Sequence, residues 1–258
     1  MKNILFRLPL APFIPKTKAS SSPKILLVRD DIIGDLLVPT SAVVKWLKDR
    51  QHDVFLVLRR EFMPIGRLML PEDRLIPLDM SAYRSSPRYR WNFLKHIRWL
   101  GLTLAIGSTI HSSVNDDIVR SSGAPARYGY QRRSSIEELW KLRRISKVRA
   151  LPAMRGSIYA HMLEHERHFL SHIFSTPVDT LYPHVRTEKV KPAGMPDKYI
   201  HYVADAGNMR RVFPAARLLP ILERLAKTHS IPLVLTALKP IPYTHKHCLN
   251  LSGRLRLE

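Results

Sequence analysis

The chain has 258 residues, of which 45% are hydrophobic and 24% charged, so it carries enough apolar side chains for a folded core and is not a disordered polymer. Its 42 lysine and arginine residues outnumber 21 aspartate and glutamate residues, and the formal net charge of +21 favours polyanionic partners such as anionic lipid, phosphorylated glycolipid or nucleic acid. A single cysteine, Cys248, excludes an intrachain disulfide.

The positive charge is concentrated in residues 84–149, where fourteen Lys and Arg residues stand against four Asp and Glu residues. No helix-turn-helix, zinc-finger or RNP-type aromatic motif accompanies this charge, so nucleic acid is the partner that we favour least. Residues 1–23 are basic and apolar, but Arg7 and three prolines interrupt them, which predicts a loose extension touching a membrane surface rather than a signal peptide. No apolar run approaches the ~18–20 residues that span a bilayer. We therefore expect a cytoplasmic protein with, at most, peripheral contact with the inner membrane.

Residues 24–130 alternate between strand and helix patterns. Short apolar runs predict strands over 24–28, 54–58 and 75–78, and helical spacing predicts helices over 39–49 and about 62–70. A basic amphipathic helix over 90–100, a strand over 102–106, a helix within 108–122 and a strand over 125–130 follow. Such alternation is typical of a parallel sheet with right-handed crossovers.

The second half of the chain is less regular. Residues 131–150 are strongly basic and predict an exposed loop or a solvated helix, and residues 157–174 predict a helix. Four prolines within residues 175–198 indicate a linker. A second α/β unit follows, with a strand over 199–203, a loop over 204–214, a helix over 215–229 and a strand over 232–236.

The first strand leads directly into a polar loop that ends in Gly34 and Asp35. In open α/β sheets ligands bind beyond the carboxyl ends of the strands, so this position places Asp35 at the mouth of a cleft. Spacing alone favours a simpler interpretation, in which Asp35 is a solvent-facing loop carboxylate or the N-cap of the following helix.

Two groups of residues invite a metal interpretation, and we do not adopt it for either. Cys248 lies beside His245 and His247, but a complete site would need ligands from elsewhere in the chain. Glu164 and His165 share a helical turn with His161, and no third strong ligand is evident there.

Five short blocks follow one another between residues 24 and 256. The first comprises the strand Ile25-Leu-Leu-Val28, the loop to Gly34-Asp35 and Pro39 in the next helix. The other four are Arg74-Leu-Ile-Pro-Leu-Asp79, Gly123-Ala-Pro-Ala-Arg-Tyr-Gly-Tyr130, His161-Met-Leu-Glu-His165 and Asp205-Ala-Gly-Asn-Met-Arg-Arg-Val-Phe-Pro214. In this order the chain resembles the heptosyltransferase-type glycosyltransferases of family 9, which build lipopolysaccharide cores.

The resemblance implies an α/β fold of the GT-B type, with an acceptor-side Rossmann-like domain over 24–174 and a donor-side Rossmann-like domain over 199–258. Family members continue past this point into a "D-S-G-P…H-x-A" block that holds the nucleotide sugar. We therefore expect a chain that is truncated in its C-terminal, donor-side domain.

The resemblance also implies an activity. The expected reaction is an inverting transfer of a sugar from a nucleotide-diphosphate sugar, with ADP-heptose as donor and a lipopolysaccharide core or similar anionic glycolipid as acceptor, without cofactor or metal. Asp35 matches the catalytic aspartate, which takes the proton of the acceptor hydroxyl. Arg210 and Arg211 match the basic loop at the donor phosphates, although the family usually has lysine in place of Arg211. The expected acceptor-binding residues are Gly34, Arg84, Arg88 and Arg90.

Two alternatives to the transferase stay open at this stage. The first is a non-catalytic remnant that binds polyanionic glycolipid without capturing a donor. The second alternative is a nucleic-acid-binding protein carried by its net charge.

Overall fold

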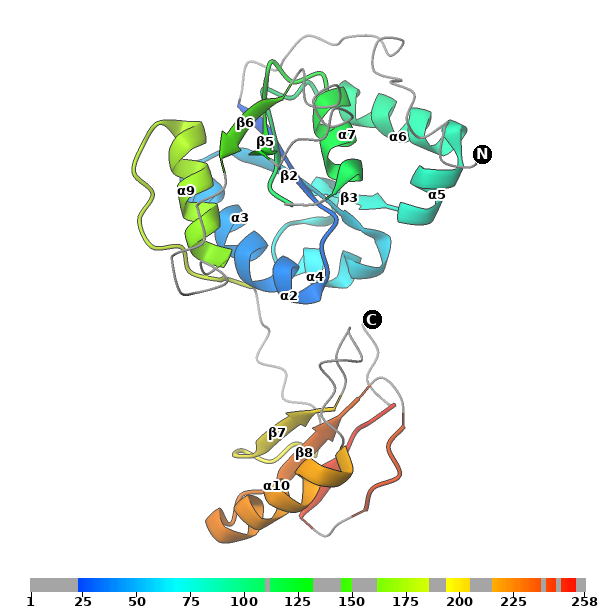
Figure 1. Cartoon of the computed structure of the whole chain (residues 1–258), viewed down its shortest axis with the longest axis vertical. Helices are drawn as coiled ribbons and strands as arrows, with labels where there is room; N and C mark the ends of the chain where they lie inside the picture. The colour runs from blue at the N-terminus through cyan, green and yellow to red at the C-terminus, as the bar shows by residue number, and fades with distance from the viewer. Residues whose placement is uncertain are drawn as a thin grey trace. The chain divides into compact units, whose positions relative to one another are not determined.

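The computed structural model describes residues 23–109, 112–131, 145–149, 162–185, 194–204, 215–237, 240–244 and 247–253. The chain divides into two compact units, Met1–Thr187 and Glu188–Glu258. Both are α/β structures (Figure 1). The boundary between the units falls inside the segment 175–198 that the proline content predicts as a linker.

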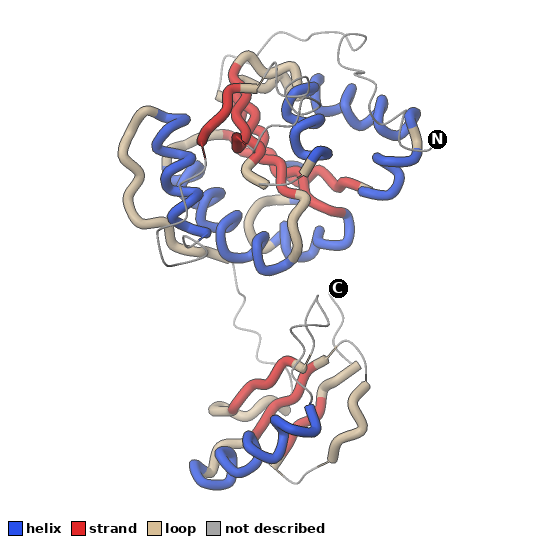
Figure 2. The backbone as a smooth tube through the Cα atoms, in the orientation of Figure 1, coloured by secondary structure: helices blue, strands red, loops and turns tan. Residues whose placement is uncertain are grey.

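A six-stranded sheet forms the centre of the first unit (Figure 2). All of its neighbouring strands pair in parallel, in the order β3-β2-β1-β4-β5-β6. This order is that of the doubly wound Rossmann fold, and it reverses direction between β1 and β4. The strands are β1 (Lys24–Arg29), β2 (Asp53–Arg59), β3 (Leu75–Leu78), β4 (Leu104–Gly107), β5 (Ala126–Gln131) and β6 (Ser146–Arg149).

Helices cover both faces of this sheet, because alternate residues of a buried strand point to opposite sides. Ile25 and Leu27 pack in one cluster with α3 (Ser41–Asp49), α4 (Met63–Arg67) and α9 (Met162–Phe174). Leu26 and Val28 pack in the other cluster with α5 (Met80–Ser85), α6 (Pro87–Trp99) and α7 (Ser113–Ser121). Short helical turns at Ile33–Asp35 (α2), Leu36–Thr40 (η2), Arg60–Phe62 (η3) and Glu72–Arg74 (η4) complete the connections.

The parallel α/β fold and the strands at 24–28, 54–58 and 75–78 are confirmed. Helix α5 is an addition to the predicted elements. It begins where the Asp79 carboxylate accepts a hydrogen bond of 2.8 Å from the Ala82 backbone N–H, and α6 begins where Ser86 Oγ accepts one of 3.2 Å from the N–H of Tyr89. These two caps divide a single stretch of chain into two helices.

Two segments differ from the prediction. Residues 146–149, placed in an exposed loop or solvated helix, form the edge strand β6, because backbone pairing with β5 needs no apolar side-chain pattern. Residues 175–185, assigned to the linker, lie on the first unit, where Val178 and Leu181 are buried in the same cluster as α9. The prolines of this segment therefore belong to an ordered stretch that packs on the first unit, and not to a free linker.

The second unit has a three-stranded parallel sheet in the order β7-β8-β9. Its elements are β7 (Ile200–Val203), α10 (Ala215–His229), β8 (Leu233–Thr236) and β9 (Cys248–Asn250). Leu219 and Ala226 of α10 are buried against Leu233 and Leu235 of β8. The strand β9 goes beyond the predicted elements. Within the part of the chain that the structure describes, no helix has the length and apolar character needed to cross a bilayer.

Candidate active site

A cavity of about 240 Å³ lies at the carboxyl edge of the first sheet. Residues that follow β1 and β4 line it, and these are the two strands between which the strand order reverses. In doubly wound folds this reversal opens the crevice in which ligands bind. The lining residues are Arg29, Asp31, Asp35, Ser108, Thr109, Tyr130, Met162, His165 and Glu166. The predicted catalytic residue Asp35 is among them.

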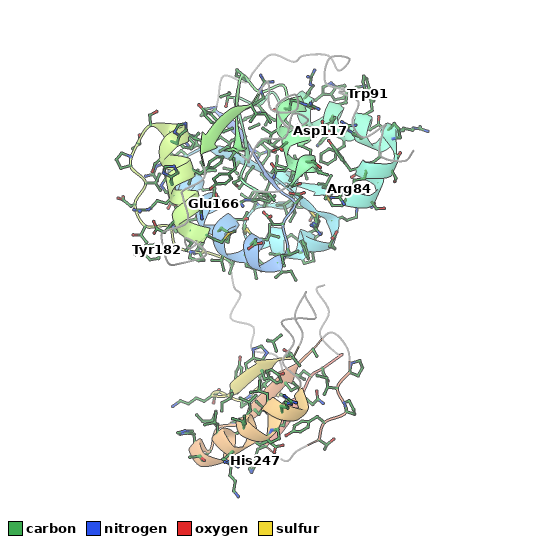
Figure 3. The ribbon with its side chains drawn as sticks, in the orientation of Figure 1. Arg84, Trp91, Asp117, Glu166, Tyr182 and His247 are labelled. Atoms are coloured by element: carbon green, nitrogen blue, oxygen red, sulfur yellow. The ribbon has the colours of Figure 1, made fainter. Side chains whose placement is uncertain are left out.

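Arg29, the last residue of β1, is bound to Glu166 of α9 inside the wall of this cavity. Arg29 has the same parity along β1 as Ile25 and Leu27, so it points to the face that α9 covers. Its Nη2 lies 2.5 Å from Glu166 Oε1, and the side chains are only 1% and 3% exposed. Figure 3 labels Glu166 on α9. Arg29 Nη1 also lies 3.4 Å from Asp31 Oδ2.

The electrostatics of the pair follow from burial. Loss of water raises the pKa of the Glu166 carboxyl, and the Arg29 guanidinium opposes that rise. Burial alone would lower the pKa of Arg29, but the Glu166 and Asp31 carboxylates raise it above its ordinary value. Arg29 therefore stays positively charged in the wall of the cavity, and its charge attracts the nearby carboxylates of Glu166 and Asp31.

The loop between β1 and Asp35 is held by the residues that follow β4. Ser112 Oγ donates a hydrogen bond to the buried Asp30 carboxylate, and Thr109 Oγ1 donates one of 2.9 Å to Asp31 Oδ2. Arg59 Nε donates to the Asp30 carbonyl oxygen at 2.6 Å. Because β2 and the β4–α7 connection both bind the loop, its path past the cavity is fixed on two sides.

Asp35 itself ends the short helix α2 and precedes a wide helical turn of the π type, Leu36–Thr40. Pro39 lies inside this turn, and since proline has no N–H, an ordinary α-helical hydrogen bond is not available there. Thr40 Oγ1 donates to the Asp35 carbonyl oxygen at 3.1 Å. The Asp35 side chain makes no capping hydrogen bond, so the N-cap interpretation does not describe it.

Gly34 leaves open space beside the loop. A Cβ atom at this position would meet no other atom within 4 Å. The residue was expected to contact the acceptor; it is exposed at the surface next to Asp35 and is not among the residues that line the cavity.

Tyr130 of β5 and His165 of α9 form another side of the cavity. The Tyr130 hydroxyl donates to the His165 carbonyl oxygen at 2.9 Å, and its ring stacks on Phe169 with centroids 4.3 Å apart. Burial, together with the Glu166 charge, raises the pKa of Tyr130 far above its ordinary value. Burial, with a contribution from His168, lowers the pKa of His165. Both side chains are therefore neutral near pH 7.

Arg90, predicted to bind the acceptor, lies instead in the interior between α6 and α7. It is 2% exposed, and its Nε and Nη2 lie 2.9 and 2.8 Å from Asp117 Oδ2. The Tyr83 hydroxyl donates to the same oxygen at 2.7 Å. The helical periodicity explains this, because Arg90 shares the inner face of α6 with Phe93, Leu94 and Ile97. We therefore correct its assignment to a residue of the core.

The remaining predicted residues lie apart from the cavity or outside the described residues. Arg84 on α5 and Arg88 on α6 are exposed and do not line the cavity. Arg210 and Arg211 fall outside the described residues, as does His161. Glu164 is half exposed and paired with Arg167 at 2.7 Å. Among the described residues no three His, Cys, Asp or Glu side chains gather as a metal site would require.

The sequence interpretation overlooked Arg29 and Glu166. A signal for Glu166 is present, because it precedes the apolar residues Phe169 and Leu170 by three and four positions and so shares their helix face. A carboxylate on the buried face of a helix needs a buried cation. The signal for Arg29 is its parity with the inward-pointing residues of β1.

Comparison with known proteins identifies the type of fold. No protein-family model and no curated protein matches the sequence. Among solved structures, the chain is similar to the ADP-heptose lipopolysaccharide heptosyltransferase II of E. coli, with a TM-score of 0.66, 16% identity, 91% of this chain and 74% of that one covered. It is also similar to a family 9 glycosyl transferase of Veillonella parvula, with a TM-score of 0.69 and 13% identity over 93% and 71% of the two chains.

A third similar structure is the E. coli heptosyltransferase WaaC with ADP, with a TM-score of 0.59 and 14% identity over 85% of this chain and 68% of that one. At these identities the comparisons establish the architecture. The chain has an α/β, Rossmann-like fold of the GT-B type, like that of the heptosyltransferases.

Proposed function

We propose that the protein is a glycosyltransferase that moves a sugar from a nucleotide-diphosphate sugar to an acceptor hydroxyl, with Asp35 as the general base. The single observation that carries this proposal is the position of Asp35 in the lining of the cavity at the strand-order reversal. The heptosyltransferase-like fold supports the reaction class, and the sequence blocks around Gly34-Asp35 support the choice of residue.

The proposed step is a direct displacement. The acceptor oxygen forms a bond to the anomeric carbon as its proton passes to the Asp35 carboxylate. The bond between the anomeric carbon and the diphosphate oxygen breaks, and the electron pair leaves with the nucleotide diphosphate. Attack opposite to the leaving group inverts the anomeric centre, and the product configuration, read by NMR, checks this part of the proposal.

Several groups in the cavity wall are suited to holding the acceptor in place. Ser108 Oγ and Glu166 Oε2 are buried in this wall, where the Ser108 hydroxyl interacts with the Glu166 carboxyl and lowers its pKa, and neither atom makes a further hydrogen bond of normal geometry among the described residues. Buried polar atoms of this kind bind water or a polar ligand. A polyhydroxylated acceptor offers both donors and acceptors of hydrogen bonds at such positions.

The finer identity of the substrates is also part of the proposal. We propose ADP-heptose as donor and an anionic lipopolysaccharide core as acceptor, used at the cytoplasmic side of the membrane. The donor phosphates would be bound by Arg210 and Arg211, whose positive charge suits a departing diphosphate. The net charge of +21 favours an anionic acceptor.

The test is turnover of ADP-heptose with a heptose-free core glycolipid, compared between the original protein and Asp35→Asn. Loss of a general base lowers kcat by about 10²–10⁴-fold. The matched control is Asp49→Asn, which removes an exposed carboxylate from α3 and leaves the rate unchanged. Equal rates for the original protein and Asp35→Asn would remove Asp35 from the mechanism. Glycolipid binding without any turnover of ADP-heptose or other nucleotide sugars would favour the binding-module alternative.

A further inference from the structure

Helix α6 carries an outward face on which cations alternate with tryptophan rings. We define the α6 outer face as Arg88, Trp91, Lys95 and Trp99, which are spaced by three, four and four residues and so share one side of the helix. Arg88 and Trp99 are exposed, and Trp91 and Lys95 are partly exposed. Figure 3 labels Trp91 on α6 and Arg84 on the neighbouring α5.

The face carries unopposed positive charge. Between Asp79 and Asp116 the chain has five Lys and Arg residues and no Asp or Glu. Within the described part of the chain, neither Arg88 nor Lys95 forms an ion pair. Lys95 Nζ instead lies 4.8 Å from the centroid of the Trp99 ring, a cation–π contact at the surface.

The core fixes which side of α6 turns outward. Phe93, Leu94 and Ile97 are buried in the cluster beneath the helix. Two further cations of the helix are also held inside, Arg90 by Asp117 and Arg98 by a hydrogen bond of 2.8 Å from its Nε to the Ser121 carbonyl oxygen. Since these contacts hold the inner face, the α6 outer face stays presented to solvent without any rearrangement.

An exposed tryptophan on this face needs an explanation. Trp99 is 63% exposed, which leaves a large apolar ring in water. Tryptophan rings with nearby lysine or arginine gather at the headgroup level of membranes, where the ring is partly dehydrated and the cation meets lipid phosphate. The outer side of a helix is also convex and suits a broad surface rather than an extended strand.

We propose that the α6 outer face is a docking surface for anionic phospholipid, through which the protein attaches peripherally to a membrane. Trp99 and the exposed part of Trp91, whose ring also packs on the core cluster beneath α6, enter the headgroup layer, and Arg88 and Lys95 bind lipid phosphates. The proposal does not depend on the transferase activity, because lipid binding is measured without donor or acceptor.

Nucleic acid is the competing polyanion. Proteins that bind single strands use a positively charged groove in which bases stack on aromatic rings. The α6 outer face is instead the convex side of a single helix, which presents its rings to a surface rather than enclosing a strand. The charge and the exposed rings therefore favour a lipid surface.

The experiment is co-sedimentation of the full chain with vesicles of phosphatidylcholine alone or of an equimolar mixture with phosphatidylglycerol. The expected result is binding to the mixed vesicles only, weakened by salt. Lys95→Glu lowers the partition coefficient by about fivefold or more, since each cation near an anionic surface contributes about that factor. Trp99→Ala lowers it several-fold, and unchanged thermal unfolding shows that both variants are folded.

Matched controls separate this face from the general positive charge of the chain. Lys48→Glu makes the same charge change at an exposed position of α3, and Tyr182→Ala removes an aromatic ring that is 69% exposed. Both controls bind mixed vesicles as the original protein does. Equal losses in Lys95→Glu and Lys48→Glu would overturn the proposal, as would Trp99→Ala binding normally. Duplex DNA that binds in a Trp99-dependent manner and displaces the vesicles would assign the face to nucleic acid instead.

Discussion

Arg29 Nη2 lies 2.5 Å from Glu166 Oε1, and this contact joins the end of β1 to the middle of α9. The two residues are far apart in the sequence, yet both line the cavity that contains Asp35. Because neither side chain is more than 3% exposed, each depends on the other for its charge to be tolerated in the interior. The Arg29–Glu166 pair therefore both forms part of the wall of the proposed active site and holds α9 against the end of β1.

Removing one member of this pair should be costly to stability. Arg29→Met leaves Glu166 buried without its cation, and Glu166→Gln leaves Arg29 with only Asp31 at 3.4 Å, so the expected loss is about 3–5 kcal/mol in the free energy of unfolding. The double variant Arg29→Met with Glu166→Gln loses less than the sum of the two single changes. Urea unfolding of the three variants measures this coupling.

An exposed pair on the same helix is the control for this prediction. Glu164 and Arg167 lie 2.7 Å apart with about half of each side chain exposed. Removing one of them changes the free energy of unfolding by less than about 1 kcal/mol. Additive losses at the Arg29–Glu166 pair would show that the two charges do not depend on each other.

Glycine at position 107 is required by the close approach of α7 to β4. A Cβ atom at Gly107 would lie 2.0 Å from Asn115 Oδ1, and Asn115 Nδ2 donates to the Val28 carbonyl oxygen at 2.8 Å. Gly107→Ala therefore displaces the side chain that ties α7 to the end of β1, and the expected cost is about 1–3 kcal/mol. Thermal unfolding measures this loss.

Gly34→Ala is the matched substitution, because a Cβ there meets nothing within 4 Å and the backbone is helical. Alanine is the better helix former, so stability should be unchanged or slightly higher. A Gly107→Ala variant as stable as Gly34→Ala would mean that α7 can move away from β4 at little cost.

His165 should make stability depend on pH. Its pKa is lowered in the folded state, first by burial and then by His168, from an ordinary value of 6.5. The unfolded chain then binds more protons between that lowered value and pH 6.5, so stability is full above pH 6.5 and falls as the pH drops below it. His165→Gln removes this component. Melting temperatures measured through this range should therefore fall less in His165→Gln than in the original protein, and parallel curves would contradict the assignment.

Local patterns in the sequence were sufficient to predict where in the fold the candidate site lies. The apolar run of β1 and the Gly34-Asp35 pair that follows it are adjacent in sequence, and the parallel sheet then places them at the strand-order reversal. The comparison with solved heptosyltransferases confirms the fold that these local blocks indicated.

Long-range pairing could not be predicted in the same way. Arg90 belongs to a run of basic residues, and only the packing of α6 against Asp117 on α7 shows that it is buried. The strand β6 has no apolar alternation, because its contribution to the sheet is made by backbone hydrogen bonds to β5. In both cases the deciding partner lies on another element, and a sequence pattern records only one member of the pair.

Arg84 and Arg88 provide a last prediction that connects acceptor binding with the membrane. The sequence interpretation assigned them to the acceptor, and the structure places Arg84 exposed on α5 and Arg88 within the α6 outer face. The double variant Arg84→Ala with Arg88→Ala should leave the KM for a water-soluble, deacylated acceptor unchanged and raise the KM for the same acceptor held in anionic vesicles. The donor KM stays constant in both assays. A rise in KM for the soluble acceptor would return these arginines to the acceptor site, because a lipid-docking surface has no part in binding a free glycan.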